Sequence, residues 1–464
     1  MTLIKSISGI RGTIGGAPGE GLTPVDIVNF TSAFASFIKS QARKEKVKVV
    51  VGRDARISGP VVESLVTGTL NSMGIDVILL GHATTPTVEI TVAKEAADGG
   101  IILTASHNPA QWNALKLLNH RGEFLSASDG EQLIKMVESG DFIYTDVENL
   151  GNTEEKSYHQ VHINEILDLD LVKPELISEA GFRIVIDCVN SVGGIIIPDL
   201  LYALGVKEVI ELYTEPDGNF PHNPEPLPEN LADISEKIKE KQADLGFVVD
   251  PDVDRLAIVN EDGTMFGEEY TLVAVADYIL SHNPGNTASN LSSSRALKDV
   301  TEKYGMNYYS SAVGEVNVVE TMKKHDCVIG GEGNGGVIYP ELHYGRDALV
   351  GIALFLSHLA GKKLKCSELK AQYPHYVISK NKISLDAGIN VDLILSKLIE
   401  EFSDEKINTV DGVKIEFDEG WVHLRKSNTE PIIRIYAEHK SREEADLLAG
   451  KIKRIVEKLS SSIK

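Results

Sequence analysis

Buried strands and amphipathic helices alternate along most of this chain, and this alternation limits the possible folds more than any other feature. From Val47 the sequence reads VKVVVG, then a stretch of helical period from Ser58 to Met73, then IDVILLG, a second helical stretch and GGIILTAS. Unbroken β-branched runs between helical stretches predict parallel strands covered by helices on both faces. Ligands of such sheets bind beyond the carboxyl ends of the strands, so functional residues are expected in the loops that follow.

The same pattern recurs twice before the chain changes character. FRIVIDCVN, VKEVIELY and ADLGFVVD predict strands of a second unit, with a helix from Glu229 to Lys241. In a third unit, RLAIVNEDGTMF predicts a hairpin, and Glu268–His282 and Glu315–Lys324 predict helices. A short ISLD strand, a helix from Val391 to Phe402, alternating strands between Val413 and Glu438 and a terminal helix predict an α+β tail.

We therefore predict an α/β protein with three similar mixed α/β three-layer domains and a smaller C-terminal α+β domain. The boundaries fall in polar stretches where the apolar periodicity lapses. The expected domains are residues 1–155, 156–254, 255–371 and 372–464.

Charge and cysteine content exclude several classes of partner. The chain has 46 Lys and Arg against 68 Asp and Glu, a formal charge of −22. Such a surface repels nucleic acid and anionic membranes, so an anionic ligand needs a locally basic pocket. Three scattered cysteines argue against a disulfide framework and favour a reducing compartment. The longest apolar run, Ala348 to Leu356, is far shorter than the about 18 residues of a membrane helix, so a soluble cytoplasmic protein is expected.

The segment ILTASHNPA places a serine in the turn after a predicted strand. Small and turn-forming neighbours leave the Ser106 hydroxyl accessible, and a serine there could accept a phosphoryl group. His107 could supply a proton or a positive charge, and Lys116 could bring a cation back to the loop. The alternative is a Ser and Asn turn that caps a helix.

Three aspartates follow another predicted strand in VVDPDVDRLAIV. Asp250, Asp252 and Asp254 alternate, so an extended backbone would point all three the same way. Convergent carboxylates require a cation, and oxygen-only ligands with a position open to phosphate favour Mg²⁺. An EF-hand is excluded because Arg255 stands where that loop needs glycine. The remaining alternative is a solvated acidic turn.

A glycine-rich loop, GGEGNGG, follows a third predicted strand. Its glycines fit a dinucleotide-binding pattern, but the expected acidic residue about twenty positions later is missing and Glu332 would repel a pyrophosphate. Glu332 and Asn334 instead suit the hydroxyl groups of a neutral sugar. A plain glycine turn is the alternative.

Cationic and hydroxyl side chains cluster in the tail, within HLRKSNTEPIIRIY. In a protein of this charge they predict a site for a phosphate that does not itself react, although a hairpin with a polar turn would have a similar sequence. The candidate residues are Arg425, Ser427, Asn428, Thr429 and Arg434.

Together and in this order, these four segments resemble those of the α-D-phosphohexomutase superfamily, the phosphoglucomutase/phosphomannomutase enzymes. SGIRG and VGRDARISG match further family patterns, so the resemblance covers the whole chain. It implies a C-terminal domain similar to the TATA-binding-protein fold and phosphorylation of Ser106. It also implies Mg²⁺ bound by the phosphoserine and the three aspartates, and a sugar bisphosphate as activator. Arg11, Lys116 and Arg255 match charged active-site positions of the family.

The resemblance also implies a mechanism and a substrate class. Phospho-Ser106 would give its phosphoryl group to a hexose phosphate, and the bisphosphorylated sugar would turn over and return its other phosphate. Many phosphomannomutase-like members have a histidine where this chain has Gly336, which leaves Lys116 and His107 as candidates for proton transfer.

The GEGNGG and GIRG segments most resemble archaeal-type phosphoglucosamine mutases. We therefore expect conversion of glucosamine 6-phosphate to glucosamine 1-phosphate. Phosphoglucomutase and phosphomannomutase activity are the alternative. A non-catalytic sugar-phosphate-binding protein and a metal-dependent phosphatase are more remote ones.

Overall fold

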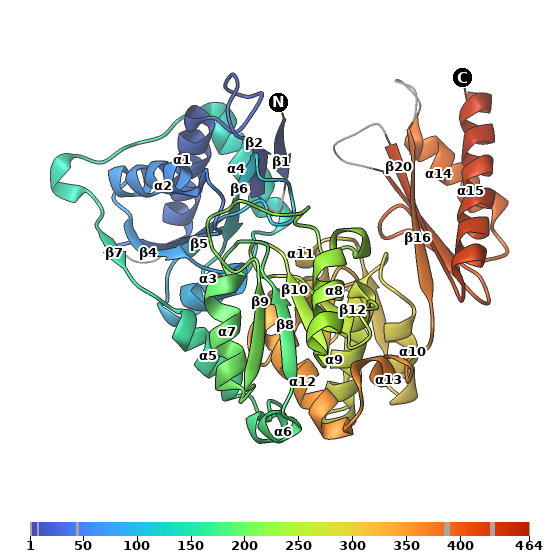
Figure 1. Cartoon of the computed structure of the whole chain (residues 1–464). Coiled ribbons are helices and arrows are strands. Elements are labelled where there is room, and N and C mark those ends of the chain that lie inside the picture. Colours follow the sequence, from blue (N-terminus) through green and yellow to red (C-terminus); the bar gives the residue numbers. More distant parts are fainter. Residues whose placement is uncertain (1, 7–8, 43–45, 385–389, 427–431, 464) are drawn as a thin grey trace. The chain divides into compact units, whose positions relative to one another are not determined.

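The computed structural model describes residues 2–6, 9–42, 46–384, 390–426 and 432–463 (Figure 1). The chain forms two compact units. The first unit comprises residues 1–278 and 334–370, and the second comprises residues 279–333 and 371–464.

A seven-stranded mixed sheet opens the first unit, in the order β1-β2-β6-β5-β3-β4-β7. As predicted, β3, β4 and β5 are parallel, whereas β6 runs antiparallel to β5. The strands are β1 (Leu3–Ser6), β2 (Gly9–Thr13), β3 (Lys48–Arg53), β4 (Asp76–His82), β5 (Gly99–Leu103), β6 (Trp112–Leu118) and β7 (Thr153–Glu155).

Helices cover both faces of this sheet, with α1 and α2 on one side and α3 on the other (Figure 1). The alternation of side chains along β3 shows why: Val49 and Val51 pack into the core under α1 and α2, and Val50 packs into the core under α3. Thr23 starts α1 with a capping box. The helices are α1 (Pro24–Gln41), α2 (Gly59–Ser72), α3 (Thr85–Lys94) and α4 (Ala127–Ser139), followed by a 3₁₀ turn (Val147–Asn149).

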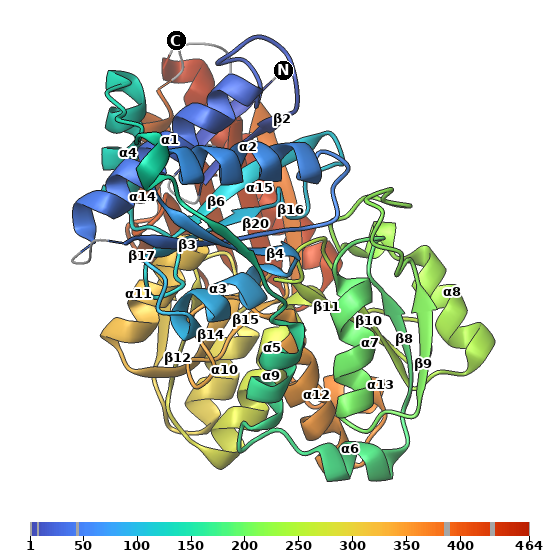
Figure 2. The same cartoon turned by 90° about the vertical axis from the view of Figure 1, so that its left-hand side faces the viewer.

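The second sheet of this unit has the order β11-β10-β8-β9, and its strands lie between α7 and α8 (Figure 2). Ile234 and Ile238 of α8 pack on Val185 and Val248. The elements are α5 (His159–Leu167), α6 (Pro174–Ala180), β8 (Arg183–Asp187), α7 (Gly193–Ala203), β9 (Glu208–Leu212), a 3₁₀ turn (Pro228–Asn230), α8 (Ala232–Lys241), β10 (Leu245–Val249), β11 (Leu256–Asn260) and α9 (Glu268–His282).

The most apolar run of the chain forms a buried helix. Residues 348–360 of α12 (Ala348–Lys362) are all buried, and Phe355 contacts the rings of Phe247 and Phe266 with centroids 6.2 and 5.2 Å apart. Within the described ranges, no helix combines the length and apolar character needed to cross a membrane. β15 (Gly336–Ile338) precedes α12, and α13 (Cys366–Lys370) follows it.

The second unit joins a parallel sheet to an antiparallel one. β12 pairs in parallel with β13 and with β14. The C-terminal sheet has the order β16-β20-β19-β18-β17, and α14 and α15 form its core with one face. The elements are β12 (Asn286–Asn290), α10 (Ala296–Lys303), β13 (Tyr308–Ser311), α11 (Glu315–Lys324), β14 (Cys327–Glu332), β16 (Val377–Ser384), α14 (Val391–Glu401), β17 (Lys406–Asn408), β18 (Val413–Glu416), β19 (Trp421–Lys426), β20 (Ile432–His439) and α15 (Arg442–Ile463).

The predicted fold class, mixed α/β domains followed by a smaller α+β domain, is confirmed. The four domain boundaries stay predictions. The helix expected from Glu229 begins only at Ala232, because Pro228–Asn230 form a 3₁₀ turn. The expected ISLD strand begins earlier, as part of β16, and its last two residues lie outside the described residues. β12 was not predicted because its sequence, NTASN, buries polar side chains and lacks a β-branched apolar run.

We expect Phe355→Ala to lower the stability of the first unit strongly. The substitution removes a fully buried ring that contacts two others, a change that costs roughly 3–5 kcal/mol in protein cores. Urea unfolding followed by circular dichroism measures the effect. Ile143→Ala, at a position that is 85% exposed, is the control and should leave the midpoint unchanged. Equal midpoints for the two variants would contradict this packing.

Candidate active site

Ser106 lies in a strained loop directly after β5. Its φ angle is +48°, a left-handed conformation that is costly for a residue with a side chain. The side chain is nearly buried, and its Oγ donates a hydrogen bond of 2.6 Å to Oδ2 of Asp250. The Ser106 amide donates to the Thr104 hydroxyl at 2.9 Å. The fold thus fixes this hydroxyl at the carboxyl end of a strand, facing an acidic group.

Arg56 fixes the backbone of this loop through hydrogen bonds to its carbonyl oxygens. Its guanidinium donates to the carbonyl oxygens of Ser106, Asn108 (2.7 Å), Pro109 (2.8 Å) and Trp112 (3.0 Å). The side chain is fully buried and is ion-paired with Asp54 at 2.9 Å.

Asp54 also accepts a hydrogen bond from the Thr104 hydroxyl, so it reaches the same loop. The VGRDARISG pattern contains both residues but does not by itself predict this role for them. Opposite charges just after the predicted strand were the available signal.

The three aspartates converge through a turn. β10 ends at Val249, and Val253 has a φ of +63° within the loop that follows. Oδ1 of Asp250 accepts the amide hydrogens of Asp254 (3.1 Å) and Arg255 (3.2 Å). The predicted convergence is therefore present, but the predicted extended backbone is wrong, because the first aspartate folds the loop back onto its own side chain.

This cluster fits a hard cation. One oxygen atom from each of Asp250, Asp252 and Asp254 lies within 4.8 Å of the others, and all three residues are fully buried. Among the described residues, Oδ1 of Asp252 and Oδ1 of Asp254 have no hydrogen-bond partner. Burial, and the charges of its two neighbours, raise the pKa of Asp250 well above its usual range. A divalent ion would relieve both the repulsion and the missing contacts.

Positive side chains surround the carboxylates. Nζ of Lys116, on β6, lies 2.6 Å from Oδ2 of Asp252 and 3.2 Å from Oδ2 of Asp254. Burial alone would lower the pKa of Lys116, but the two aspartate charges outweigh it and raise that pKa. Nη2 of Arg346, a residue that sequence reasoning missed, donates to the same Asp254 oxygen at 2.7 Å. Thr85, also missed, donates to Oδ2 of Asp252 at 2.5 Å.

The other predicted residues of the first unit lie around this centre. Nδ1 of His107 is 3.5 Å from Oγ of Ser106, and burial together with the charge of Arg255 lowers its pKa well below the ordinary value. The charge of Arg11 acts on the same imidazole, and Arg11 faces Ala114 across β2 and β6. Nε of Arg255 is 3.9 Å from Asp254.

The two predicted sugar-contacting residues fall in different units. Glu332 ends β14 in the second unit, and its Oε1 accepts hydrogen bonds from Asn290 (2.8 Å) and the Gly314 amide (3.1 Å). Asn334 belongs to the first unit, where its Oδ1 accepts from the Gly336 amide at 3.2 Å. Gly335 has a φ of +86°, and a Cβ there would lie 2.4 Å from the Leu256 carbonyl oxygen, so the loop needs glycine at that point.

Basic residues form a row across the C-terminal sheet. Arg425 on β19 is the register partner of Arg434 on β20, which in turn faces Lys382 on β16. Nε of Arg425 is 3.1 Å from Asp411, whereas Arg434 and Lys382 are exposed. Lys382 was missed because it lies far from the motif in sequence. The predicted Ser427, Asn428 and Thr429 lie outside the described residues.

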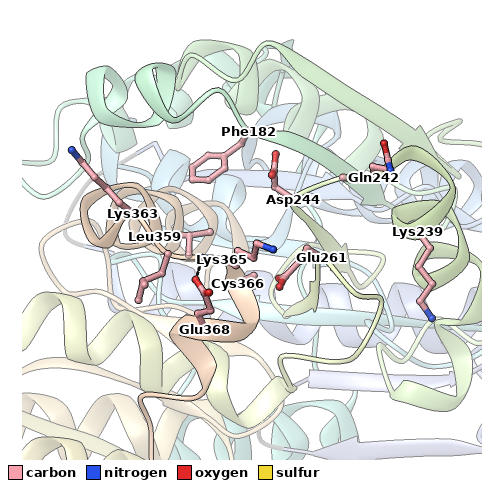
Figure 3. Close-up of a pocket in the computed structure, with 12 residues that line it drawn as sticks. Phe182, Lys239, Gln242, Asp244, Glu261, Leu359, Lys363, Lys365, Cys366 and Glu368 are labelled. Atoms are coloured by element: carbon pink, nitrogen blue, oxygen red, sulfur yellow. Dashed lines mark hydrogen bonds between the residues drawn. The ribbon is translucent and has the colours of Figure 1, made fainter.

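A cavity of about 740 Å³ lies elsewhere in the first unit, beside α8 and α13 (Figure 3). Lys239, Glu261 and Glu368 are among its lining side chains, and none of the described lining residues is a predicted site residue. Unlike this cavity, the aspartate cluster brings fully buried carboxylates into contact with cations, an arrangement typical of functional sites.

Comparison with known proteins identifies relatives over the whole chain. Models of the phosphoglucomutase/phosphomannomutase α/β/α domains I, II and III match residues 3–144, 160–263 and 267–376, and the C-terminal domain model matches residues 389–455.

A probable phosphoglucosamine mutase of Methanopyrus kandleri is 34% identical over 98% of each chain. A phosphoglucomutase/phosphomannomutase of Thermococcus kodakarensis is 36% identical over 94% of this chain and 95% of its own. The crystal structure of a phosphoglucomutase/phosphomannomutase family protein from Burkholderia thailandensis is 28% identical, with a TM-score of 0.84 over 99% of this chain and 98% of that one.

A buried ionic network fixes the segment that carries Arg346. His343 lies 3.2 Å from both Glu89 and Asp347, and Asp347 also lies 2.9 Å from Nε2 of His162. Burial lowers the pKa of His343, but the hydrogen bond to Asp347 and the close contact with the Glu89 carboxylate outweigh it and raise that pKa to about 10. His343 is therefore charged at neutral pH.

We expect stability to fall in alkaline solution because of His343. Because the pKa of His343 is higher in the folded state than in the unfolded state, its protonation stabilises the fold. This stabilisation is complete below about pH 6.5, the unfolded-state pKa, and is lost as the pH rises toward 10. The loss of one bound proton on unfolding lowers the free energy of unfolding by up to about 1.4 kcal/mol for each pH unit. Urea unfolding at pH 7 and pH 9 should show this loss in the wild type and a smaller one in His343→Gln. His120→Gln, at an exposed position, should behave as wild type. Parallel losses in all three proteins would refute the assignment.

Proposed function

The chain belongs to the phosphoglucomutase/phosphomannomutase family of phosphohexomutases, and from this premise we propose that it interconverts glucosamine 6-phosphate and glucosamine 1-phosphate through a phosphorylated Ser106. One observation carries the proposal. The Ser106 hydroxyl, held in a strained loop, donates to Asp250 within a buried cluster of three carboxylates that fits a metal ion.

The surroundings of Ser106 suit phosphoryl transfer. In the proposed first step, the bond between phosphorus and Oγ of Ser106 breaks while phosphorus bonds to the free sugar hydroxyl, whose proton leaves. The second step is the reverse, from the other phosphate of the bisphosphorylated sugar back to Ser106. A magnesium ion held by Asp250, Asp252 and Asp254 with an oxygen of the phosphoserine would neutralise charge on the transferring group.

His107 is the proposed acceptor of the hydroxyl proton. The proposal rests on position, because Nδ1 of His107 lies 3.5 Å from Oγ of Ser106. Burial and the charge of Arg255 lower the pKa of His107, which leaves the imidazole neutral and so with a nitrogen free to accept a proton, although it makes the ring a weaker base. Lys116 is the weaker candidate, because its contacts with two aspartates keep it protonated. We assign Lys116, Arg11 and Arg255 to the binding of negative charge.

The basic row of the C-terminal sheet is the proposed anchor for the second phosphate. Like charges directly opposite each other destabilise a sheet, and Asp411 contacts only Arg425 of this row, so a bound anion would offset the remaining repulsion. Arg425, Arg434 and Lys382 are aligned in this way and precede or follow residues 427–431 along the chain. A phosphate dianion would satisfy this row, with Ser427, Asn428 and Thr429 as further proposed ligands.

The preference for an amino sugar rests on the GEGNGG loop. This loop and the GIRG segment resemble those of phosphoglucosamine mutases, and a curated relative carries that name. Glu332, a buried carboxylate, can accept hydrogen bonds from sugar hydroxyl groups and equally from the ammonium group of glucosamine. Asn334 is the proposed second contact to the sugar. Names of similar proteins support both specificities, phosphoglucosamine mutase and phosphoglucomutase/phosphomannomutase.

A mutase assay on the three sugars tests the proposal. Purified protein with Mg²⁺ and a sugar bisphosphate is given glucosamine, glucose and mannose phosphates in parallel. We expect a kcat/KM preference of at least about tenfold for glucosamine phosphate, or about 1.4 kcal/mol of transition-state binding. Ser106→Ala should abolish turnover.

A preference for glucose or mannose phosphate would reject the amino-sugar assignment but would leave the proposed mutase activity intact. Release of inorganic phosphate in place of isomerisation would identify a phosphatase. Full activity of Ser106→Ala would overturn the phosphoserine mechanism.

Lys382 provides a separate test of the phosphate anchor. We expect Lys382→Ala to raise KM for the sugar phosphate about three- to tenfold with little change in kcat, because a phosphate that does not react loses one cationic contact. Lys380→Ala is the matched control, since this exposed lysine lies on the same strand but is the register partner of Tyr436 and not of an arginine. Equal KM values for both variants would reject the anchor.

A further inference from the structure

Arg346 occupies the space that a side chain at position 336 would need. A Cβ atom built on Gly336 would lie 2.3 Å from Cδ and 3.0 Å from Cγ of Arg346. Gly336 begins strand β15 and, among the described glycines, is not one with a positive φ, so the backbone itself does not require glycine. The absence of a side chain at this position therefore makes room for the stem of Arg346.

The head group of Arg346 reaches the metal-binding carboxylates. Nη2 donates to Oδ2 of Asp254 at 2.7 Å, and Lys116 approaches the same oxygen at 3.2 Å. The Arg346 side chain is only 10% exposed and the Asp254 side chain is fully buried. A charge pair shielded from water in this way is strong, and its geometry is fixed.

The backbone around Arg346 is anchored on both sides. A Cβ at Gly345 would lie 1.8 Å from an oxygen of Glu89, so the chain passes directly over that carboxylate. Asp347 caps α12 by accepting the amide hydrogen of Leu349 at 2.8 Å and contacts His162. Arg346 therefore has little freedom to move away from Asp254.

We propose that Arg346 is a positioning residue of the tri-aspartate site that holds Asp254 in place and competes with a divalent cation for its charge. The inference rests on the proposed metal site and deepens it. A fixed positive charge beside a cation site weakens cation binding, and the same charge stabilises negative charge on a phosphoryl group. Arg346 thus lowers metal affinity and raises the rate of turnover.

Metal binding to the full-length protein tests the first effect. Isothermal titration with Mn²⁺ compares wild type, Arg346→Met and Arg346→Lys. We expect Arg346→Met to bind Mn²⁺ about five- to thirtyfold more tightly, and Arg346→Lys to remain within about threefold of wild type because its charge is kept. Unchanged or weaker binding in Arg346→Met would overturn the proposal.

Turnover at saturating Mg²⁺ tests the second effect. We expect kcat of Arg346→Met to fall at least tenfold and Arg346→Lys to recover most of it. A merely structural role would weaken metal binding and lower kcat together, without rescue by lysine. If no hexose phosphate is turned over by the wild type, the proposed function fails while the titration still decides the role of Arg346.

Position 336 gives an independent check. Gly336→Ala should displace Arg346 and tighten Mn²⁺ binding in the same direction as Arg346→Met, and the double variant should be no tighter than Arg346→Met alone. Gly361→Ala is the matched control, because a Cβ there would meet open space beyond its own stretch of helix α12. Wild-type affinity in Gly336→Ala, or additive effects in the double variant, would contradict the steric link.

Discussion

The carboxylate of Asp250 joins the two loops on which the candidate active site depends. Its Oδ2 accepts a hydrogen bond from the Ser106 hydroxyl. Its Oδ1 accepts hydrogen bonds from two backbone amides of its own loop. The serine follows a strand of the first sheet and the aspartate follows a strand of the second. A single side chain thus brings a candidate nucleophile and a candidate metal site together and fixes the turn on which the other two aspartates lie.

Burying three carboxylates together is costly, and the first unit offsets this cost with fixed cations. Lys116 and Arg346 contact the aspartates directly, and Arg255 lies beside them. The overall charge of −22 makes such a cluster of cations distinctive. Under the proposed function, these cations would bind a phosphoryl group that the rest of the surface would repel, because fixed charges shielded from water act more strongly than charges in water.

Much of this arrangement could be predicted from the sequence because local patterns encode it. The β-branched runs of β3, β5 and β10 predicted strands, and the loops after them supplied Ser106 and the three aspartates. Contacts between distant residues could not be read in this way. Arg56 reaches a loop about fifty positions away, and Arg346 reaches Asp254 across ninety-two. The turn at Val253 was missed because alternating aspartates suit an extended strand equally well.

One measurement, the phosphate content of Ser106, tests the roles proposed for both Ser106 and Asp250. Protein treated with a phosphatase and then incubated with Mg²⁺ and glucose 1,6-bisphosphate would be digested and analysed by mass spectrometry, with Asp250→Asn beside it. We expect phosphate on Ser106 of the wild type and little or none on Ser106 of Asp250→Asn. A wild-type protein that turns over a hexose phosphate while Ser106 carries no phosphate would contradict it.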